Sequence, residues 1–280
     1  MPDSCLQYAV IGDPVGHSLS PAMQNAAFRA LGISASYIAV HVHGPDLAAF
    51  AEDARRHLAG FNITVPHKNS ILPFLDDVDP AARAAGSVNT VTVLPNGTLK
   101  GCSTDGYGIE HAVLEAGGPA LKGASICFIG CGGVTPALAF HAAEAGAVSL
   151  RILNRTVEKA RLLKEKLHVR HPELECVAAP LAEAASLLDG AVLTVQCTSL
   201  GLDPADPAPV DPALLWKNTF AFDLVYKRKT RFLSGAEAAG IPCADGSAML
   251  LHQGARSFEI WTGRTAPLDT MRRALAEAGR

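Results

Sequence analysis

A glycine-rich turn between a strand-like and a helix-like segment is the feature that most constrains the fold. The turn reads Gly130-Cys131-Gly132-Gly133; it follows the apolar run 125–129 and precedes a helical pattern at 136–145. Glycines let the backbone approach a ligand closely, and the unpaired N–H groups at a helix start attract negative charge. This order of strand, turn and helix is typical of a dinucleotide-binding domain, in which Gly130, Gly132 and Gly133 contact a pyrophosphate.

The residues after the next expected strand, 148–153, indicate which dinucleotide binds. They read Asn154-Arg155-Thr156, and Lys159 lies four residues beyond Arg155. An acid at this place would bind the ribose 2′-hydroxyl of NAD, whereas Arg155 and Lys159 offer cations to a 2′-phosphate. The pattern therefore predicts NADP. The alternative is a tight turn that binds nothing, and Thr135, at a position where a small residue is usual, keeps that alternative open.

Strand and helix patterns alternate through the rest of the chain, which predicts an α/β fold with two sheets. In the first part we expect strands at 8–11, 37–42, 61–65, 88–94 and 98–102, and helices at 21–31, 46–58 and 107–116. Pro95-Asn96-Gly97 predicts a hairpin, which makes this sheet mixed. In the second part we expect strands at 125–129, 148–153, 191–196 and 220–224, helices at 136–145 and 157–167, and two final helical segments at 249–261 and 268–278. The second sheet is predicted to be parallel and doubly wound.

Composition narrows the classes of function. The 280 residues are 49% hydrophobic and 18% charged, which suits two well-packed domains, and the formal net charge is −3. This balance gives no broad cationic face for nucleic acid or anionic lipid. No apolar run has membrane-spanning length, and the N-terminus lacks a basic segment followed by an apolar one, so we expect a cytoplasmic protein that acts on a small molecule.

Cysteine and histidine spacing predicts no metal site. The seven cysteines are scattered singly, and reduced thiols are expected. Cys127 and Cys131 bracket a strand end and a turn, which makes zinc ligation there the weaker interpretation. The ten histidines show no H-E-x-x-H pattern.

Polar side chains follow the strands of the first part. Ser18 and Ser20 precede a helix whose first turn contains Pro21, so either ligand binding or capping by Ser20 explains them. Lys68 follows the strand that carries Asn62 and Thr64, and it is either a catalytic acid or a solvated surface charge.

Two further strand ends carry an amide and a carboxylate. Asn89 lies in Gly86-Ser87-Val88-Asn89-Thr90, and Asp105 lies in Thr104-Asp105-Gly106. The carboxylate of Asp105 either acts in a site or caps the helix that follows it.

Together these segments resemble the shikimate dehydrogenase family over nearly the whole chain and in the same order. The matching segments are Gly12-Asp13-Pro14, His17 to Pro21, Asn62 to Lys68, Gly86 to Thr90, Thr104-Asp105-Gly106, the Gly130 turn, Asn154-Arg155-Thr156, Asp223 to Tyr226, and Asp245-Gly246 through Gln253.

The resemblance implies reversible NADPH-dependent reduction of 3-dehydroshikimate to shikimate, in the route to aromatic amino acids. It implies an N-terminal mixed-sheet substrate-binding catalytic domain, residues 1–105 plus 246–280, and a C-terminal Rossmann NADP-binding domain, residues 106–245. Lys68 and Asp105 would be the catalytic pair. The substrate would be held by Ser18, Ser20, Thr64, Asn89, Tyr226 and Gln253, and the cofactor by the Gly130 turn, Asn154, Arg155, Thr156, Lys159 and Thr198. The chain would be a monomer or a homodimer.

Four positions depart from the family pattern, which commonly has His at Gln24, Asn at Ser103, Asn at Gln196 and Pro at Arg228. They leave open a paralogue that oxidises quinate or a related ring acid. A catalytically silent NADP-binding regulator is the alternative from a different class of protein, although such a sensor would not need the Lys68 and Asp105 pair.

Overall fold

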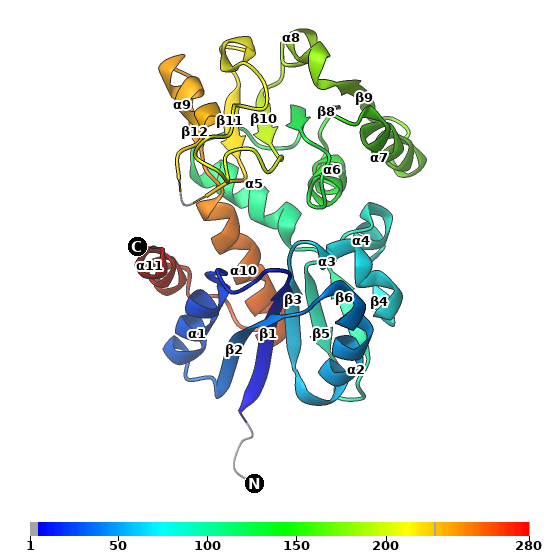
Figure 1. The fold of residues 1–280 in the computed structure, drawn as a ribbon, viewed down its shortest axis with the longest axis vertical. Coiled ribbons are helices and arrows are strands. Elements are labelled where there is room, and N and C mark those ends of the chain that lie inside the picture. Colours follow the sequence, from blue (N-terminus) through cyan, green and yellow to red (C-terminus); the bar gives the residue numbers. More distant parts are fainter. Residues whose placement is uncertain (1–4, 227, 280) are drawn as a thin grey trace. The chain divides into compact units, whose positions relative to one another are not determined.

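The chain forms two compact units in a computed structural model that describes residues 5–226 and 228–279 (Figure 1). The first unit contains the residues up to Gly108 and those from Leu251 onward, and the second contains Ile109–Leu250. The sequence predicted the boundaries between the two domains at 105/106 and 245/246. In the structure the chain passes from one unit to the other inside two helices, α5 (Asp105–Glu115) and α10 (Ser247–Thr262), so no loop marks either boundary. In the described part of the chain, no helix has the length and apolar character needed to cross a membrane.

The first unit is built on a mixed six-stranded sheet in the order β2-β1-β3-β5-β6-β4. Its strands are β1 (Leu6–Gly12), β2 (Ala35–His41), β3 (Gly60–Ile63), β4 (Asp77–Val78), β5 (Thr90–Val93) and β6 (Leu99–Cys102). β1 pairs in parallel with β2 and β3, whereas β5 is antiparallel to β3 and β6. The mixed sheet and the 95–97 turn agree with the sequence.

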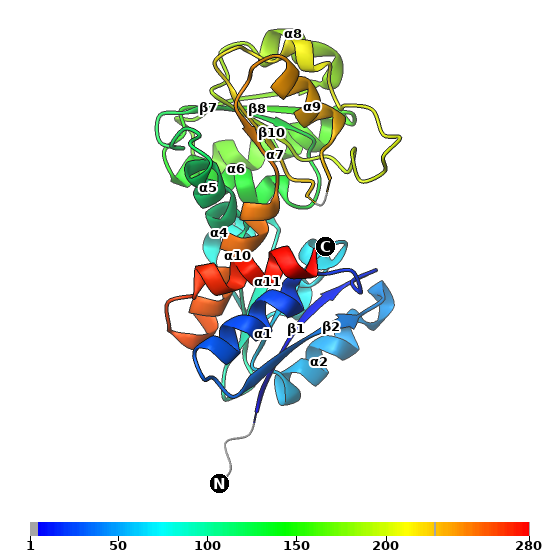
Figure 2. The ribbon, with the colours of Figure 1, turned by 90° about the vertical axis from the view of Figure 1, so that its left-hand side faces the viewer.

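Helices pack on both faces of this sheet because successive residues of β1 point in opposite directions. Tyr8 and Val10 belong to one buried cluster, with residues of α1 (Ser20–Ala30), α10 and α11 (Leu268–Ala278). Ala9 and Ile11 belong to another, which includes residues of α2 (Leu47–His57). Figure 2 shows α1 and α11 side by side, in agreement with their contacts. Shorter helices α3 (His67–Ser70) and α4 (Pro80–Ala85) follow the strands β3 and β4.

The indole of Trp261 joins the helix α10 to this sheet. Its N–H donates a hydrogen bond of 3.0 Å to the carbonyl of Val91, and its ring lies 4.8 Å from that of Tyr8. A Cβ on Gly60 would lie 2.5 Å from the indole nitrogen. The absence of a side chain at residue 60 therefore makes room for the tryptophan.

The second unit is a parallel six-stranded sheet in the order β12-β11-β10-β7-β8-β9. Its strands are β7 (Ser125–Ile129), β8 (Ser149–Asn154), β9 (Glu175–Pro180), β10 (Leu193–Gln196), β11 (Phe220–Asp223) and β12 (Cys243–Ala244), and its helices are α6 (Thr135–Glu144), α7 (Val157–Arg170), α8 (Ala184–Leu187) and α9 (Arg231–Ala238). Counted from β7, this is the Rossmann order 3-2-1-4-5-6. The predicted fold class is confirmed, and the strand order reverses between β7 and β10, next to Gly130.

Candidate active site

Lys68 is held in place by the backbone around it. The N–H of Thr64, just after β3, donates to the carbonyl of Ile11 at 2.9 Å, and the N–H of Asp13 donates to that of Val65 at 3.1 Å. The buried imidazole of His67 lies 2.6 Å from the carbonyl of Val42. The carbonyl of Lys68 itself accepts a hydrogen bond from the Val88 N–H at 2.9 Å. Lys68 therefore lies in a short helix, α3, whose backbone and neighbouring residues are hydrogen-bonded to the adjacent segments of the unit.

The ammonium of Lys68 forms an ion pair with the carboxylate of Asp105, with Nζ 2.7 Å from Oδ2. Both side chains are largely buried, at 15% and 4% exposed. The alternative of a solvated surface lysine is therefore wrong. Asp105 is the first residue of α5, and its described hydrogen bonds run to the side chains of Lys68 and Asn89.

Asn89 connects Asp105 to the C-terminal part of the first unit. Its amide nitrogen lies 3.0 Å from Oδ1 of Asp105, 2.9 Å from the hydroxyl of Thr104 and 3.2 Å from Oε1 of Gln253. Its oxygen accepts the backbone N–H of Thr104 at 2.8 Å. The structure thus brings together four of the predicted site residues, namely Lys68, Asn89, Asp105 and Gln253.

A buried polar network that the sequence did not predict lies next to Asn89. Asn62 donates to the hydroxyls of Thr90 at 3.1 Å and Ser257 at 3.0 Å, and it accepts the Tyr37 hydroxyl at 2.7 Å. Thr104 and Thr90 also contact each other. Several separate chain segments meet here, and no local pattern signals such a meeting. The network reaches Asn89 through the Thr90 hydroxyl, which donates to its side-chain oxygen at 2.9 Å. Because an unpaired buried polar group costs about 1 to 3 kcal/mol, these bonds hold Asn89 in place.

The two predicted serines lie at the start of α1. The N-cap residue of α1 is Leu19 and makes no side-chain cap, so the capping role considered for Ser20 is wrong. Instead the hydroxyl of Ser18 accepts the N–H of Ser20 at 3.3 Å, a local role that the sequence analysis did not give to Ser18. Ser20 is buried and Ser18 half-buried.

The remaining predicted substrate residues are Thr64 and Tyr226. Thr64 is half-buried after β3 in the first unit. Tyr226 lies in the second unit, after β11, and burial raises the pKa of its hydroxyl above the ordinary value.

Gln24 also belongs to the first unit. Its amide donates to the carbonyl of Gly254 at 2.8 Å, while its fully buried oxygen has no described partner.

In the second unit, the Gly130 turn has the conformation that a dinucleotide loop needs. Gly130 has φ of +102°, and a Cβ there would lie 2.7 Å from Cγ2 of Thr198. Both the backbone conformation and the lack of space therefore exclude a side chain at this position. Gly132 and Gly133 are exposed. The hydroxyl of Thr135 donates to the Gly130 carbonyl at 2.9 Å, so this departure from the glycine pattern closes the turn with a hydrogen bond.

Side chains at the end of β8 and after β10 border this turn. Asn154 accepts the Cys131 N–H at 3.0 Å and donates to the carbonyl of Thr156 at 2.8 Å. Arg155, Thr156 and Lys159 are exposed, so their side chains are accessible to a ligand from solvent. The hydroxyl of Thr198 accepts the Leu200 N–H at 3.1 Å. These residues fit the pyrophosphate and the 2′-phosphate of NADP in kind and in position along the sheet edge.

A buried carboxylate, Asp223, ends β11. It accepts the Thr230 hydroxyl at 2.6 Å, the Val225 N–H at 2.9 Å and the Gln196 amide at 3.3 Å. Burial raises its pKa to about 6, although the hydrogen bonds from Thr230 and Val225 oppose that rise. Gln196, at a position where the family commonly has Asn, thus contacts this carboxylate.

Comparison with known proteins identifies the family. The model of the shikimate dehydrogenase substrate-binding domain matches residues 10–91, and that of the shikimate 5′-dehydrogenase C-terminal domain matches residues 246–276. A relative named shikimate dehydrogenase (NADP(+)) from Moorella thermoacetica is 42% identical and covers 96% of this chain and 92% of its own.

Two solved structures are also similar. Shikimate 5-dehydrogenase from Thermus thermophilus, in complex with NADP(H) and shikimate, is 38% identical with a TM-score of 0.86 and covers 98% of this chain and 99% of its own. Quinate dehydrogenase from Corynebacterium glutamicum, in complex with NAD, is 28% identical with a TM-score of 0.87 and covers 97% and 99%. With these motifs and this fold, the chain belongs to the shikimate dehydrogenase family.

Proposed function

We propose that this chain catalyses the reversible NADPH-dependent reduction of 3-dehydroshikimate to shikimate. The observation that carries the proposal is the buried Lys68 and Asp105 ion pair, 2.7 Å long, in a chain of this family. Arg155, just after β8, and Lys159, in the first turn of α7, support NADP rather than NAD. The expected cytoplasmic location and the expected monomeric or homodimeric state stay predictions.

Lys68 is proposed to supply the proton. When bound, NADPH supplies a hydride to the carbonyl carbon, which leaves negative charge on the oxygen. The Lys68 ammonium stabilises that charge and donates its proton to form the hydroxyl. Asp105 orients the ammonium through the ion pair, with Nζ 2.7 Å from its Oδ2. Asn89 holds Asp105 through its other oxygen.

The proposed substrate groups are neutral donors and acceptors. Ser18, Ser20, Thr64, Asn89 and Gln253, all of the first unit, suit the carboxylate and hydroxyls of a polyhydroxylated ring acid, and a substrate contact by Tyr226 stays a prediction. A site built from such groups rejects a ligand that lacks the matching hydroxyl, because each buried polar group left unpaired costs about 1 to 3 kcal/mol.

An activity assay with two substrates tests the proposal. Reduction of NADP is followed spectrophotometrically with shikimate and with quinate at equal concentrations, and then with NAD in place of NADP. We expect the highest kcat/KM for shikimate with NADP. A preference for quinate would support the alternative of a paralogue that oxidises quinate, and the similarity to a solved quinate dehydrogenase is the reason for testing it. Cofactor binding without turnover on either acid would support the regulator and overturn the proposal.

Arg155→Ala is expected to weaken NADP binding by about 1.5 to 3 kcal/mol and to leave NAD binding nearly unchanged, because one charged hydrogen bond to the 2′-phosphate is lost. Isothermal titration with each cofactor measures the difference. Lys164→Ala removes an exposed cation farther along α7 and serves as the matched control. Equal losses for both cofactors in Arg155→Ala would remove Arg155 from the phosphate site.

A further inference from the structure

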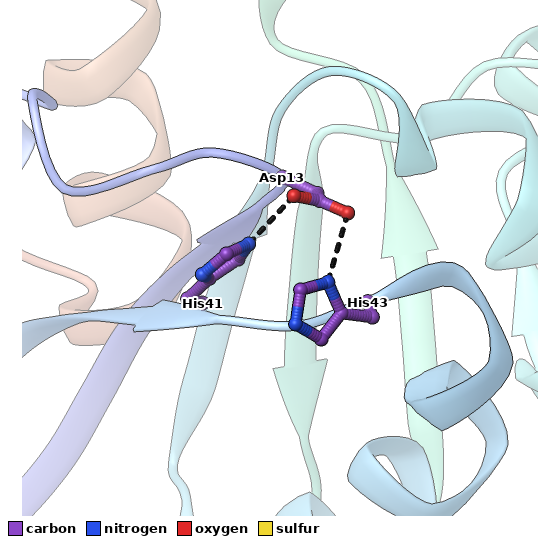
Figure 3. A group of neighbouring side chains, drawn as sticks. All are labelled: Asp13, His41 and His43. Atoms are coloured by element: carbon purple, nitrogen blue, oxygen red, sulfur yellow. Dashed lines mark hydrogen bonds and ion pairs between the residues drawn. The ribbon is translucent and has the colours of Figure 1, made fainter.

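Strand pairing in the first unit brings together three side chains from two separate segments of the sequence. β1 and β2 run in parallel with Gly12 opposite His41, and the Val42 N–H continues the ladder to the Gly12 carbonyl at 3.2 Å. Asp13 follows Gly12, so it reaches the end of β2 at the level of Val42. Figure 3 shows its carboxylate facing the rings of His41 and His43.

The two histidines share one face because the chain is extended from His41 to His43. His41 ends β2, and His43 has φ of −75° and ψ of 155°. Alternate residues of an extended chain point to the same side. Val42, between them, is 4% exposed and packs into the core, so both imidazoles point outward.

The three side chains already converge on one point. Nε2 of His41 lies 2.6 Å from Oδ1 of Asp13, and Nδ1 of His43 lies 3.2 Å from Oδ2. One ligand atom from each residue lies within 4.8 Å of the others. Within residues 5–226 and 228–279, no other group of three or more His, Cys, Asp or Glu side chains has this arrangement.

Charge and access also suit a cation. The carboxylate of Asp13 supplies the negative charge of the site, because an aspartate side chain is ordinarily ionised at neutral pH. Both imidazoles are exposed, at 48% and 63% for His41 and His43, so an ion reaches them from solvent.

We propose that Asp13, His41 and His43 bind one divalent transition-metal ion, with Zn²⁺ as the representative ion and water in the remaining coordination position. Two imidazole nitrogens and one carboxylate suit such ions better than Mg²⁺ or Ca²⁺, which take oxygen ligands. Zinc–ligand distances of about 2.0 to 2.2 Å place neighbouring ligand atoms of a tetrahedral site roughly 3.3 to 3.6 Å apart. The three ligand atoms, which all lie within 4.8 Å of one another, are already close to that spacing.

This inference is independent of the dehydrogenase activity and is tested by binding alone. The competing interpretation is a hydrogen-bonded surface cluster that holds protons and no metal. The chain offers a matched control in His57, an exposed histidine whose ring lies 3.5 Å from the carboxylate of Asp53 and which, within the described residues, belongs to no such group of three.

The experiment titrates the full-length protein with Zn²⁺ by isothermal titration calorimetry. Wild type, His43→Gln, His41→Gln/His43→Gln and His57→Gln are compared, each with its circular dichroism spectrum as a check on folding. All four contain the same seven cysteines, so zinc binding by thiols cancels in the comparison. Nickel-induced broadening of histidine ring resonances locates the ion by an independent measurement.

We expect wild type to bind one Zn²⁺ ion per chain. The affinity for this ion should fall at least about tenfold in His43→Gln, and binding should disappear in the double variant. The titration of His57→Gln should match wild type. Resonances of His41 and His43 should broaden first with Ni²⁺. Unchanged zinc stoichiometry and affinity in the folded double variant would overturn the proposal, as would an equal loss in His57→Gln.

Discussion

Lys68→Ala is expected to lower kcat for shikimate oxidation by at least about a hundredfold, the smallest usual effect of losing a general acid or base. Cofactor affinity should stay close to wild type, because Lys68 lies in the first unit and the Gly130 turn in the second. Steady-state kinetics and NADP titration measure the two effects. Turnover near the wild-type value would rule out the proposed proton transfer.

A second lysine provides the matched control for Lys68. Lys100 also pairs with an aspartate of the first unit, Asp77, at 3.4 Å, but the side chains of this pair are both 58% exposed. Lys100→Ala should therefore leave kcat unchanged, since a solvent-exposed ion pair contributes little to stability. If both variants lost activity alike, the effect would come from ion-pair loss in general and not from Lys68.

Asp223 is expected to make the wild-type protein lose stability as the pH rises from about 4 to about 7. In the unfolded chain this carboxyl releases its proton near the ordinary aspartate pKa of 3.8, whereas burial in the folded protein raises that pKa to about 6. Between these values the folded state binds more protons, so raising the pH favours unfolding. A difference of about 2 pKa units corresponds to about 3 kcal/mol, and this loss of stability is complete above the folded pKa.

The comparison of Asp223→Asn with wild type measures this effect. The free energy of unfolding of the wild type, minus that of the variant, should fall by about 2 to 2.5 kcal/mol between pH 4 and pH 7 in urea titrations. Asp189→Asn, which changes an exposed aspartate of the same unit, should show no comparable trend. A flat or rising difference for Asp223→Asn would contradict the raised pKa.

The sequence predicted the elements whose apolar patterns are strong. The strand at 125–129 and the helix at 268–278 have the expected bounds. By contrast, β9 was missed because Glu-Cys-Val-Ala-Ala-Pro is an edge strand with little burial, and β12 has two residues. Such strands are defined by their neighbours, since pairing with β8 or β11 makes them strands.

Candidate site residues were predictable where a functional group follows a strand, as for Lys68 and Asp105. The network of Tyr37, Asn62 and Ser257 was not, because its members come from distant segments and each resembles an ordinary polar residue of a strand or helix. The cluster at Asp13 was missed for the same reason. The pattern His-x-His becomes a possible metal site only after the pairing of β1 with β2 adds a carboxylate.

Trp261, which contacts Val91, gives the first unit a spectroscopic label, and Trp216 gives the second unit another. The chain has two tryptophans, Trp261 in the first unit and half-buried Trp216 in the second. Replacing either one with phenylalanine leaves a single fluorophore, whose emission reports the solvent exposure of one unit alone. Loss of structure in each half of the molecule can therefore be timed separately with the two single-tryptophan variants, without an attached dye.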